Sequence, residues 1–175
     1  MNDCAFETAR LRVADWYVLA GGPSHAFSLV GAVRTLLTSE VTAQLPAEWQ
    51  GAYSERRALD WIRDRDAEGT PLLVVSRRTG RPVGLLLLHE AKTAAGDGPE
   101  VRLGYLIAEA EWGRGLASEL VGGFVTWARQ RDVGSIIAGV SASNPASIRV
   151  LEKSGFVRAE EQPEGGSELF FTLER

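Results

Sequence analysis

The segment YLIAEAEWGRGLASEL, residues 105–120, constrains the fold more than any other part of the sequence. It predicts a strand that runs through an acidic turn and two glycines into a helix. Gly113 and Gly115 permit positive φ or close backbone approach, and the first amides of a helix lack partners within the helix. Those amides and the helix dipole favour an anion such as phosphate, and Arg114 adds a positive charge. The alternative is a plain glycine turn with an exposed Arg114.

A second helix is predicted by the run NPASIRVLEKSG. Asn144 is a favoured N-cap residue, Pro145 suits the first helical position, and Gly155 suits the position after the last turn. Between the two helices lies GSIIAGVSA, which predicts a buried strand. The strands at 101–108 and 135–142 are then joined by a helix, so they should be parallel with a right-handed crossover.

The clearest hairpin signal is PLLVVSRRTGRPVGLLLLHEA, in which two apolar runs flank Thr79 and Gly80. FETARLRV predicts a first strand, and FVRAEEQPEGGSELFFTLE predicts a closing pair of strands. SHAFSLVGAVRTLL and SERRALDWIRDRDAEG each predict a helix. We expect the second of these helices to begin after Ser54 and to place Leu59 and Ile62 on one face.

These elements predict a single α/β (α+β) domain over residues 1–175. Their order is a strand, two helices, three strands, a helix, a strand, a helix and two strands. Because the hairpins are antiparallel, we expect a mixed, mostly antiparallel sheet of about 6–7 strands with about four helices on its two faces. The pair Gly122-Gly123, inside the helix at 115–129, predicts close packing of that helix on the sheet.

Composition excludes several classes of protein. The net charge of -4 and the pI near 5.3 argue against binding of nucleic acid across the surface. Cys4 and two histidines do not form a metal-ligand pattern, so we expect no metal. The run PVGLLLL is far shorter than the about 20 residues of a membrane span, and the first ten residues lack the apolar core of a signal peptide. We therefore expect a soluble, cytoplasmic protein.

Two known phosphate-binding motifs do not fit the glycine turn. The Walker pattern requires Lys-Ser/Thr after GxxxxG, and the sequence lacks it. The dinucleotide fingerprint requires GxGxxG and an acidic residue at the end of the next strand. Here the series is Gly113, Gly115 and Ser118, and the next strand ends in VSASN without a carboxylate. A nicotinamide-dependent oxidoreductase is therefore disfavoured, and it stays as a third alternative.

YLIAEAEWGRGLASEL and NPASIRVLEKSGF together resemble the GNAT superfamily of N-acetyltransferases. The opening ETARLRV also resembles the RimJ/RimL branch, the ribosomal-protein N-terminal acetyltransferases. The close resemblance covers about residues 100–157. It implies acetyl-CoA as the acyl donor, a GNAT-type sheet whose parallel strand pair splays at the cofactor site, and an amine as acceptor. The branch also suggests a homodimer.

The resemblance implies that the turn from Trp112 to Ala117 binds the CoA pyrophosphate, with Trp112 in place of the Gln or Arg of many members. Backbone groups of residues 106–108 would pair with the pantetheine arm like an added strand, and one amide would polarise the thioester carbonyl. The cofactor-binding residues that we expect are Leu106, Ile107, Ala108, Trp112, Gly113, Arg114, Gly115, Leu116, Ala117, Ser118, Asn144 and Ser147. Asn144 and Ser147 have a second interpretation, as a helix cap and a first-turn residue only.

The groups that transfer protons are harder to assign. Many relatives carry a tyrosine that protonates the departing thiolate at the position of Leu151, which cannot do so, and Ser147 or a water would replace it. A thiol pKa of about 8.5 makes this loss tolerable. Glu100 is our first candidate for the base, and His89 and Glu90 are rivals. The absence of a clear base favours an acceptor of low pKa, such as an α-amine.

We therefore predict an acetyl-CoA-dependent N-acetyltransferase that acts on the primary amine of a small molecule or a protein N-terminus. Direct attack in a ternary complex is expected, because no well-placed cysteine or serine nucleophile is evident. The alternative is a non-catalytic acyl-CoA-binding module that regulates a partner. Leu151 supports that alternative, as does Arg102, which occupies the place of an acidic residue in the branch.

The acceptor pocket is expected from residues 20–60 and from the loops near 90–99 and 160–167. Trp16, Trp49 and Trp61 could line that pocket, although apolar tryptophans more often serve packing.

Overall fold

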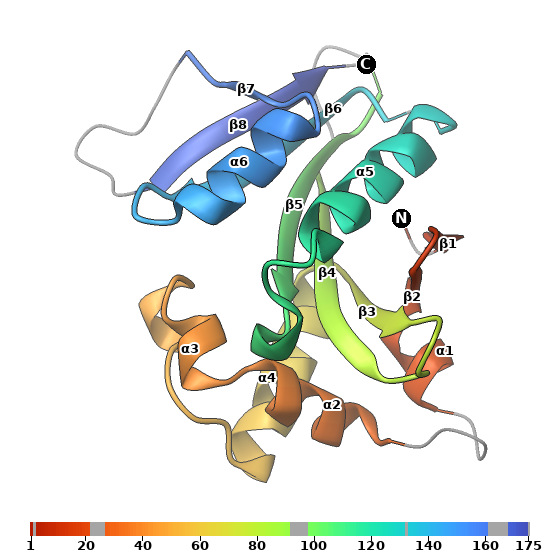
Figure 1. Cartoon of the computed structure of the whole chain (residues 1–175), viewed down its shortest axis with the longest axis vertical. Coiled ribbons are helices and arrows are strands. Elements are labelled where there is room, and N and C mark those ends of the chain that lie inside the picture. Colours follow the sequence, from red (N-terminus) through yellow and green to blue (C-terminus); the bar gives the residue numbers. More distant parts are fainter. Residues whose placement is uncertain (2, 22–26, 92–97, 132, 161–167, 175) are drawn as a thin grey trace.

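The computed structural model describes residues 1, 3–21, 27–91, 98–131, 133–160 and 168–174. Within them the chain forms an eight-stranded sheet in the order β1-β2-β3-β4-β5-β6-β8-β7 (Figure 1). The strands are β1 (Phe6–Glu7), β2 (Leu11–Asp15), β3 (Thr70–Ser76), β4 (Pro82–Ala91), β5 (Glu100–Ile107), β6 (Ser135–Ser141), β7 (Val157–Arg158) and β8 (Glu168–Glu174). Neighbouring strands are antiparallel except β5 and β6, which are parallel. The predicted mixed, mostly antiparallel sheet is confirmed.

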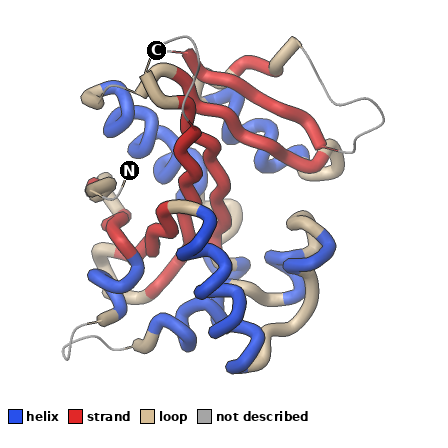
Figure 2. The backbone as a smooth tube through the Cα atoms, turned by 180° about the vertical axis from the view of Figure 1, so that it is seen from behind, coloured by secondary structure: helices blue, strands red, loops and turns tan. Residues whose placement is uncertain are grey.

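Helices cover both faces of this sheet. They are α1 (Trp16–Ala20), α2 (Leu29–Leu36), α3 (Ser39–Thr42), α4 (Glu55–Glu68), α5 (Leu116–Arg129) and α6 (Pro145–Lys153), with short 3-10 turns η1 (Ala47–Trp49) and η2 (Glu109–Glu111). Helices α5 and α6 share one core with Leu72 and Val74, and α1, α2 and α4 share the other with Leu73 and Val75. Figure 2, turned by 180° from Figure 1, shows the face of the sheet that α1, α2 and α4 cover. Alternate residues of β3 thus enter opposite cores, which explains its continuous apolar run. No helix in the described part of the chain is long and apolar enough to span a membrane.

The parallel strands β5 and β6 stay together over only a short length. Strand β5 pairs with β4 along its whole length, from Glu100 to Ile107. Its pairing with β6 covers only Glu100 to Arg102. Strand β6 continues beside β8 instead, so the two parallel strands part after Arg102. The residues of β5 from Leu103 to Ile107 therefore present a free edge at the middle of the sheet, as the expected splayed pair requires.

The predicted first strand is divided in two. Thr8 N–H donates to the Leu11 carbonyl at 2.9 Å, and Leu11 N–H donates to Thr8 Oγ1 at 3.0 Å. These bonds close a tight turn that places Ala9 and Arg10 at its tip and returns the chain as β2. The sheet therefore has one strand more than the sequence predicted within 6–15.

Two further differences concern helices. The chain turns into α1 directly after β2, because the Asp15 carboxylate accepts hydrogen bonds from the amides of Tyr17 and Val18. Helix α4 begins after Ser54 as predicted, with Ser54 Oγ accepting from the Arg57 amide at 3.2 Å. The predicted apolar face of α4 is wrong at one position, since Ile62 is buried but Leu59 is 50% exposed.

Helix α5 packs closely on the N-terminal hairpin at one of its two internal glycines. A Cβ at Gly123 would lie 2.7 Å from Thr8 Cγ2 and 2.8 Å from Phe6 Cε2, whereas a Cβ at Gly122 would meet nothing within 4 Å. The expected close contact is thus correct for Gly123 and wrong for Gly122. The contact reaches β1 at the edge of the sheet.

These two neighbouring glycines provide a matched pair of variants. Gly122→Ala should stabilise the protein by about 0.5–1 kcal/mol, because alanine favours the helix and finds open space. Gly123→Ala should destabilise it, because overpacking costs about 1–3 kcal/mol and exceeds the gain in helix propensity. Urea unfolding of both variants measures the difference. Equal stabilisation by the two substitutions would contradict the packing of α5 on the hairpin.

Candidate cofactor site

The described residues enclose a pocket of about 760 Å³ where β5 and β6 part. Its walls come from α3 and the residues after it, the end of β5, the glycine turn, the start of α5, and α6 along its length. The lining residues are Glu40, Val41, Gln44, Leu45, Tyr105, Leu106, Ile107, Glu111, Trp112, Gly113, Gly115, Leu116, Ala117, Ser118, Ser143, Asn144, Ala146, Ser147, Arg149, Val150 and Lys153. All the predicted cofactor-binding residues except Ala108 and Arg114 belong to this set.

The glycine turn has the backbone form that the sequence predicts. Gly113 and Gly115 have φ values of 72° and 74°, a region that residues with side chains rarely adopt. Gly115 is the N-cap of α5 and offers no side-chain oxygen to the first amides of the helix. The first amides of α5 therefore have no partner within the helix. A left-handed residue followed by right-handed ones brings successive N–H groups together, which makes an anion-binding concavity.

The charge around this turn differs from the expectation. Arg114 Nη1 pairs with Glu111 Oε2 at 3.0 Å, and the Arg114 side chain does not line the pocket. The expected role of Arg114 along a diphosphate is therefore not seen in its side-chain placement. Arg149 and Lys153 line the pocket instead. Their spacing of four residues places both on one face of α6, and that spacing was the signal available in the sequence.

The free edge of β5 also departs from the expectation in detail. Ala108 N–H donates to the Val83 carbonyl at 2.9 Å, so the backbone of Ala108, and by alternation that of Leu106, faces β4. The backbone groups that face the gap belong to Tyr105 and Ile107. Trp112 Nε1 already donates to the Ile107 carbonyl at 2.7 Å. Of the expected residues 106–108, only Ile107 directs its backbone toward the gap, and Tyr105 takes the place of Leu106 and Ala108.

Tyr105 and Ser147 meet inside the pocket. The Tyr105 hydroxyl lies 2.7 Å from Ser147 Oγ, and Asn144 Oδ1 accepts from the Ser147 amide at 3.0 Å. Burial raises the pKa of Tyr105 to about 12, although the hydrogen bond with Ser147 works in the opposite direction. The phenol therefore stays protonated at neutral pH. Leu151, one turn further along α6, is buried and carries no polar group.

The proposed bases lie away from this pocket. Glu100 begins β5 at the end remote from Tyr105 and lies 3.7 Å from Arg102 Nε. His89 Nδ1 contacts the Glu68 carbonyl at 2.6 Å, and Glu90 pairs with the amino group of Met1 at 3.0 Å. The structure brings none of Glu100, His89 and Glu90 to the pocket lining. No group of described residues forms a metal site.

The expected acceptor elements are only partly in place. Glu40 and Val41 of α3 and Gln44 and Leu45 after it line the pocket. Gln44 Oε1 accepts a hydrogen bond from Ser143 Oγ at 2.8 Å across it. Trp16 and Trp61 are buried in the core, and Trp49 packs against them with 5.6 Å between the Trp49 and Trp61 ring centroids. All three tryptophans therefore serve packing. The expected contributions of 92–97 and 161–167 lie outside the described residues.

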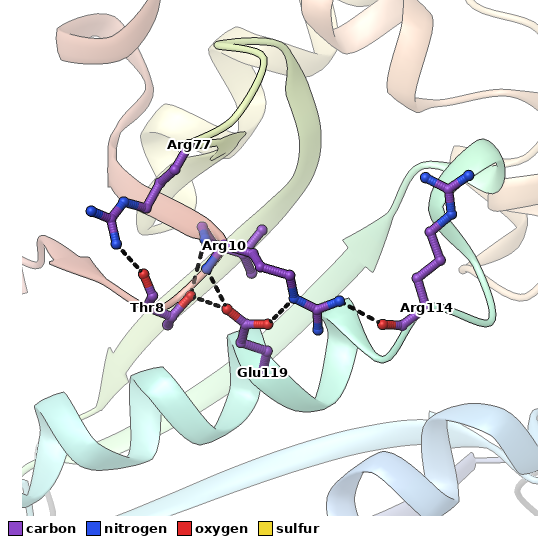
Figure 3. A network of polar contacts seen from close by, with 6 residues as sticks. Thr8, Arg10, Arg77, Arg114 and Glu119 are labelled. Carbon is purple, nitrogen blue, oxygen red and sulfur yellow. Dashed lines mark hydrogen bonds and ion pairs between the residues drawn. The ribbon is translucent and has the colours of Figure 1, made fainter.

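A polar network supports the glycine turn from behind (Figure 3). Glu119, in the first turns of α5, accepts from Thr8 Oγ1 at 2.5 Å and from the Arg10 amide at 2.7 Å. Its second oxygen accepts from Arg10 Nε at 2.5 Å. Arg10 Nη1 donates in turn to the carbonyl oxygen of Arg114 at 2.8 Å. The tip of the N-terminal hairpin thus contacts both the glycine turn and the helix that follows it.

Comparison of the chain with known proteins identifies the family to which it belongs. A model described as the acetyltransferase (GNAT) domain matches residues 30–157. The L-methionine sulfoximine/L-methionine sulfone acetyltransferase of Pseudomonas aeruginosa is 24% identical over 109 residues, which are 62% of this chain and 63% of that relative. The match therefore spans less than two thirds of the relative's length.

Solved structures share the whole fold. An acetyltransferase of the GNAT family from Bacillus anthracis gives a TM-score of 0.74 at 19% identity, over 98% of both chains. A ribosomal-protein-S5-alanine acetyltransferase from Vibrio fischeri gives 0.62 at 16% identity, over 98% of this chain and 97% of that one. AAC(6')-Ib, solved with ribostamycin and coenzyme A, gives 0.70 at 21% identity, over 94% and 92%.

The network around Glu119 predicts a pH dependence of stability. Burial works to raise the pKa of Glu119, but hydrogen bonds from Thr8 and Arg10 and the charge of Arg10 outweigh it and lower the pKa. A lowered carboxyl pKa stabilises the fold above the ordinary value of about 4.3, and this contribution is lost as the pH falls through the lowered value. Between pH 7 and pH 3, the urea midpoint should fall more for the wild type than for Glu119→Gln. The control Glu109→Gln, at an exposed residue of η2, should follow the wild type. Parallel curves for the wild type and Glu119→Gln would contradict the lowered pKa.

Proposed function

Because the chain belongs to the acetyltransferase (GNAT) domain family, we propose that it is an acetyl-CoA-dependent N-acetyltransferase acting on a primary amine. The observation that carries this proposal is the meeting of two features in one pocket: the amide concavity at residues 113–118 and the backbone of Tyr105 and Ile107 on the free edge of β5. A diphosphate suits the first, and an amide-containing arm suits the second. One donor molecule, acetyl-CoA, carries both groups.

The residues present fit such a donor. A side chain at Gly113 would meet nothing within 4 Å, so the backbone there is open to a ligand. The first amides of α5, with the N-terminal end of the helix dipole, would hold the pyrophosphate. Arg149 and Lys153, on the facing wall, would supply the positive charge that the Arg114 side chain does not bring to the pocket. The backbone groups of Tyr105 and Ile107 would bind the pantetheine arm.

When bound, the donor supplies an acetyl thioester whose carbon accepts the amine nitrogen and whose sulfur leaves as a thiolate. We assign to Ser147, which lines the pocket, a hydrogen bond to this sulfur. Either hydroxyl can donate in the 2.7 Å contact between Tyr105 and Ser147 Oγ, and with the Tyr105 phenol as the donor the serine hydrogen would be free for the sulfur. A hydrogen bond is sufficient for this leaving group, because a thiol has a pKa of about 8.5.

Direct transfer follows from the nucleophiles that the chain offers. Cys4, the only cysteine of the sequence, is buried in the core and does not line the pocket. Burial raises the pKa of its thiol to about 12, so it is not a nucleophile at neutral pH. We therefore place the amine and the thioester together in a ternary complex.

The acceptor is best matched by an amine of low pKa. The candidate bases Glu100, His89 and Glu90 are absent from the pocket, and the carboxylates that line it are Glu40 and Glu111. An α-amine, with a pKa of about 8, becomes neutral with little help, whereas a lysine amine at about 10.4 does not. Amino acids and peptide N-termini are therefore the first acceptors to test, and the homodimer stays a prediction.

A thiol-release assay with acetyl-CoA tests the function. The amine panel should contain L-methionine sulfone, an alanine peptide, a serine peptide, spermidine and ribostamycin, and we expect release with an α-amine. Calorimetry with coenzyme A accompanies the assay. Tight binding without release on any amine would favour a regulatory acyl-CoA-binding module, and protection by NAD but not coenzyme A would favour an oxidoreductase.

The hydroxyl pair can be tested by substitution. Ser147→Ala should lower kcat by up to about tenfold, because one hydrogen bond to the departing sulfur is worth about 0.5–1.5 kcal/mol. Tyr105→Phe should lower kcat in the same direction by a smaller factor, because it frees the Ser147 hydroxyl from its partner. Ser154→Ala is the matched control, since Ser154 Oγ donates to the Val150 carbonyl on the same helix and does not line the pocket. An unchanged kcat in Ser147→Ala would remove this serine from the reaction.

A further inference from the structure

We infer that Arg10 is a positioning residue for the donor site, because its guanidinium fixes the orientation of the peptide unit between Arg114 and Gly115. This inference rests on the proposed function, since it concerns the turn to which we assign the pyrophosphate. Arg10 itself does not line the pocket and acts through the backbone of the turn.

The contacts of Arg10 span the joint between the turn and the helix. Its Nη1 donates to the Arg114 carbonyl at 2.8 Å, and its Nε donates to Glu119 Oε2 at 2.5 Å (Figure 3). Its backbone amide donates to the other Glu119 oxygen at 2.7 Å. One planar guanidinium therefore holds the turn and helix α5 at a fixed separation, which a lysine with a single ammonium group does not reproduce.

The Arg114 carbonyl is the point where the turn most needs such a contact. It lies between Gly113 and Gly115, both at positive φ, and glycine moves readily between regions of φ. The C=O and the following N–H of a planar trans peptide point in opposite directions. With its carbonyl bound by Arg10, the unit directs the Gly115 N–H away from Arg10. Rotation of this peptide would replace an N–H donor with a carbonyl oxygen, which repels phosphate.

The hairpin tip is itself held in place from two sides. Thr8 Oγ1 donates to Glu119 at 2.5 Å, and the Thr8 methyl packs where a Cβ at Gly123 would lie 2.7 Å away. Arg77 Nη1 donates to the Thr8 carbonyl at 2.6 Å. The position of the Arg10 backbone is thus set by contacts that do not involve the glycine turn. The guanidinium therefore contacts the Arg114 carbonyl from a backbone that other contacts hold in place.

A comparison of two donors separates this role from a general effect on folding. Coenzyme A carries the pyrophosphate, whereas acetyl-pantetheine carries the thioester arm without it. In Arg10→Ala the turn samples more than one peptide orientation, and the apparent affinity falls with the fraction that is competent. We expect the Kd for coenzyme A, measured by calorimetry, to rise about tenfold while kcat/KM with acetyl-pantetheine stays within about twofold.

Three further variants complete the experiment. Arg10→Lys keeps the charge but not the paired contacts, so it should behave like Arg10→Ala. Glu119→Gln should weaken coenzyme A binding by a smaller factor, and it preserves the test if Arg10→Ala does not fold. Arg12→Ala, on the same hairpin and paired only with Glu7 at 3.8 Å among the contacts of the described residues, should match the wild type.

The outcomes distinguish this inference from the proposed function. If the wild type binds coenzyme A and Arg10→Ala binds it equally well, the inference is wrong and the proposed function stands. Equal losses with coenzyme A and acetyl-pantetheine would also overturn it, because they would indicate a structural role alone. If the wild type does not bind coenzyme A, the proposed function fails and the inference falls with it.

Discussion

The separation of β5 from β6 after Arg102 is the feature on which the rest of the structure depends. A strand in the middle of a sheet normally uses all its backbone N–H and C=O groups in hydrogen bonds with its two neighbouring strands. Here β6 continues along β8 through Ser141, and β5 continues along β4 through Ile107. The opening between them gives the pocket one wall of backbone groups that β6 does not pair, and the turn after β5 then places the start of α5 beside it. A ligand that paired with this edge of β5 would therefore also lie beside the N-terminus of α5.

Buried side chains of α5 and α6 keep this opening from closing. On one face, Leu116, Leu120 and Phe124 of α5 pack into the core below the sheet, and on the same face Leu151 holds α6. The amphipathic faces of both helices fix them on opposite sides of the gap. Their polar ends then converge on it, with the amides of α5 on one side and Asn144, Ser147 and Lys153 on the other. Packing thus sets the width of the site, and the polar groups set what it binds.

The sequence predicted the features that depend on neighbouring residues. Asn144, Pro145 and Gly155 define α6 through its own caps, and Gly113 and Gly115 define the turn through their φ values. It did not predict contacts between distant segments. The pairing of Tyr105 with Ser147 joins a strand to a helix, and the bond from Arg10 to the Arg114 carbonyl joins the beginning of the chain to its second half. Leu59 fits the helical pattern but faces solvent, because the pattern cannot say where the neighbouring layer ends.

The contact between the N-terminal hairpin and the glycine turn has a thermodynamic consequence. The coupling free energy between two binding events is the same in both directions. If the docked hairpin strengthens ligand binding at the turn, ligand binding therefore stabilises the docked hairpin by the same free energy. The N-terminal hairpin and the diphosphate end of the ligand would then affect each other through the contacts of the hairpin with the Arg114 carbonyl and Glu119. The N-terminal hairpin forms no wall of the pocket, yet its docking on α5 would be more stable with the ligand bound than without it.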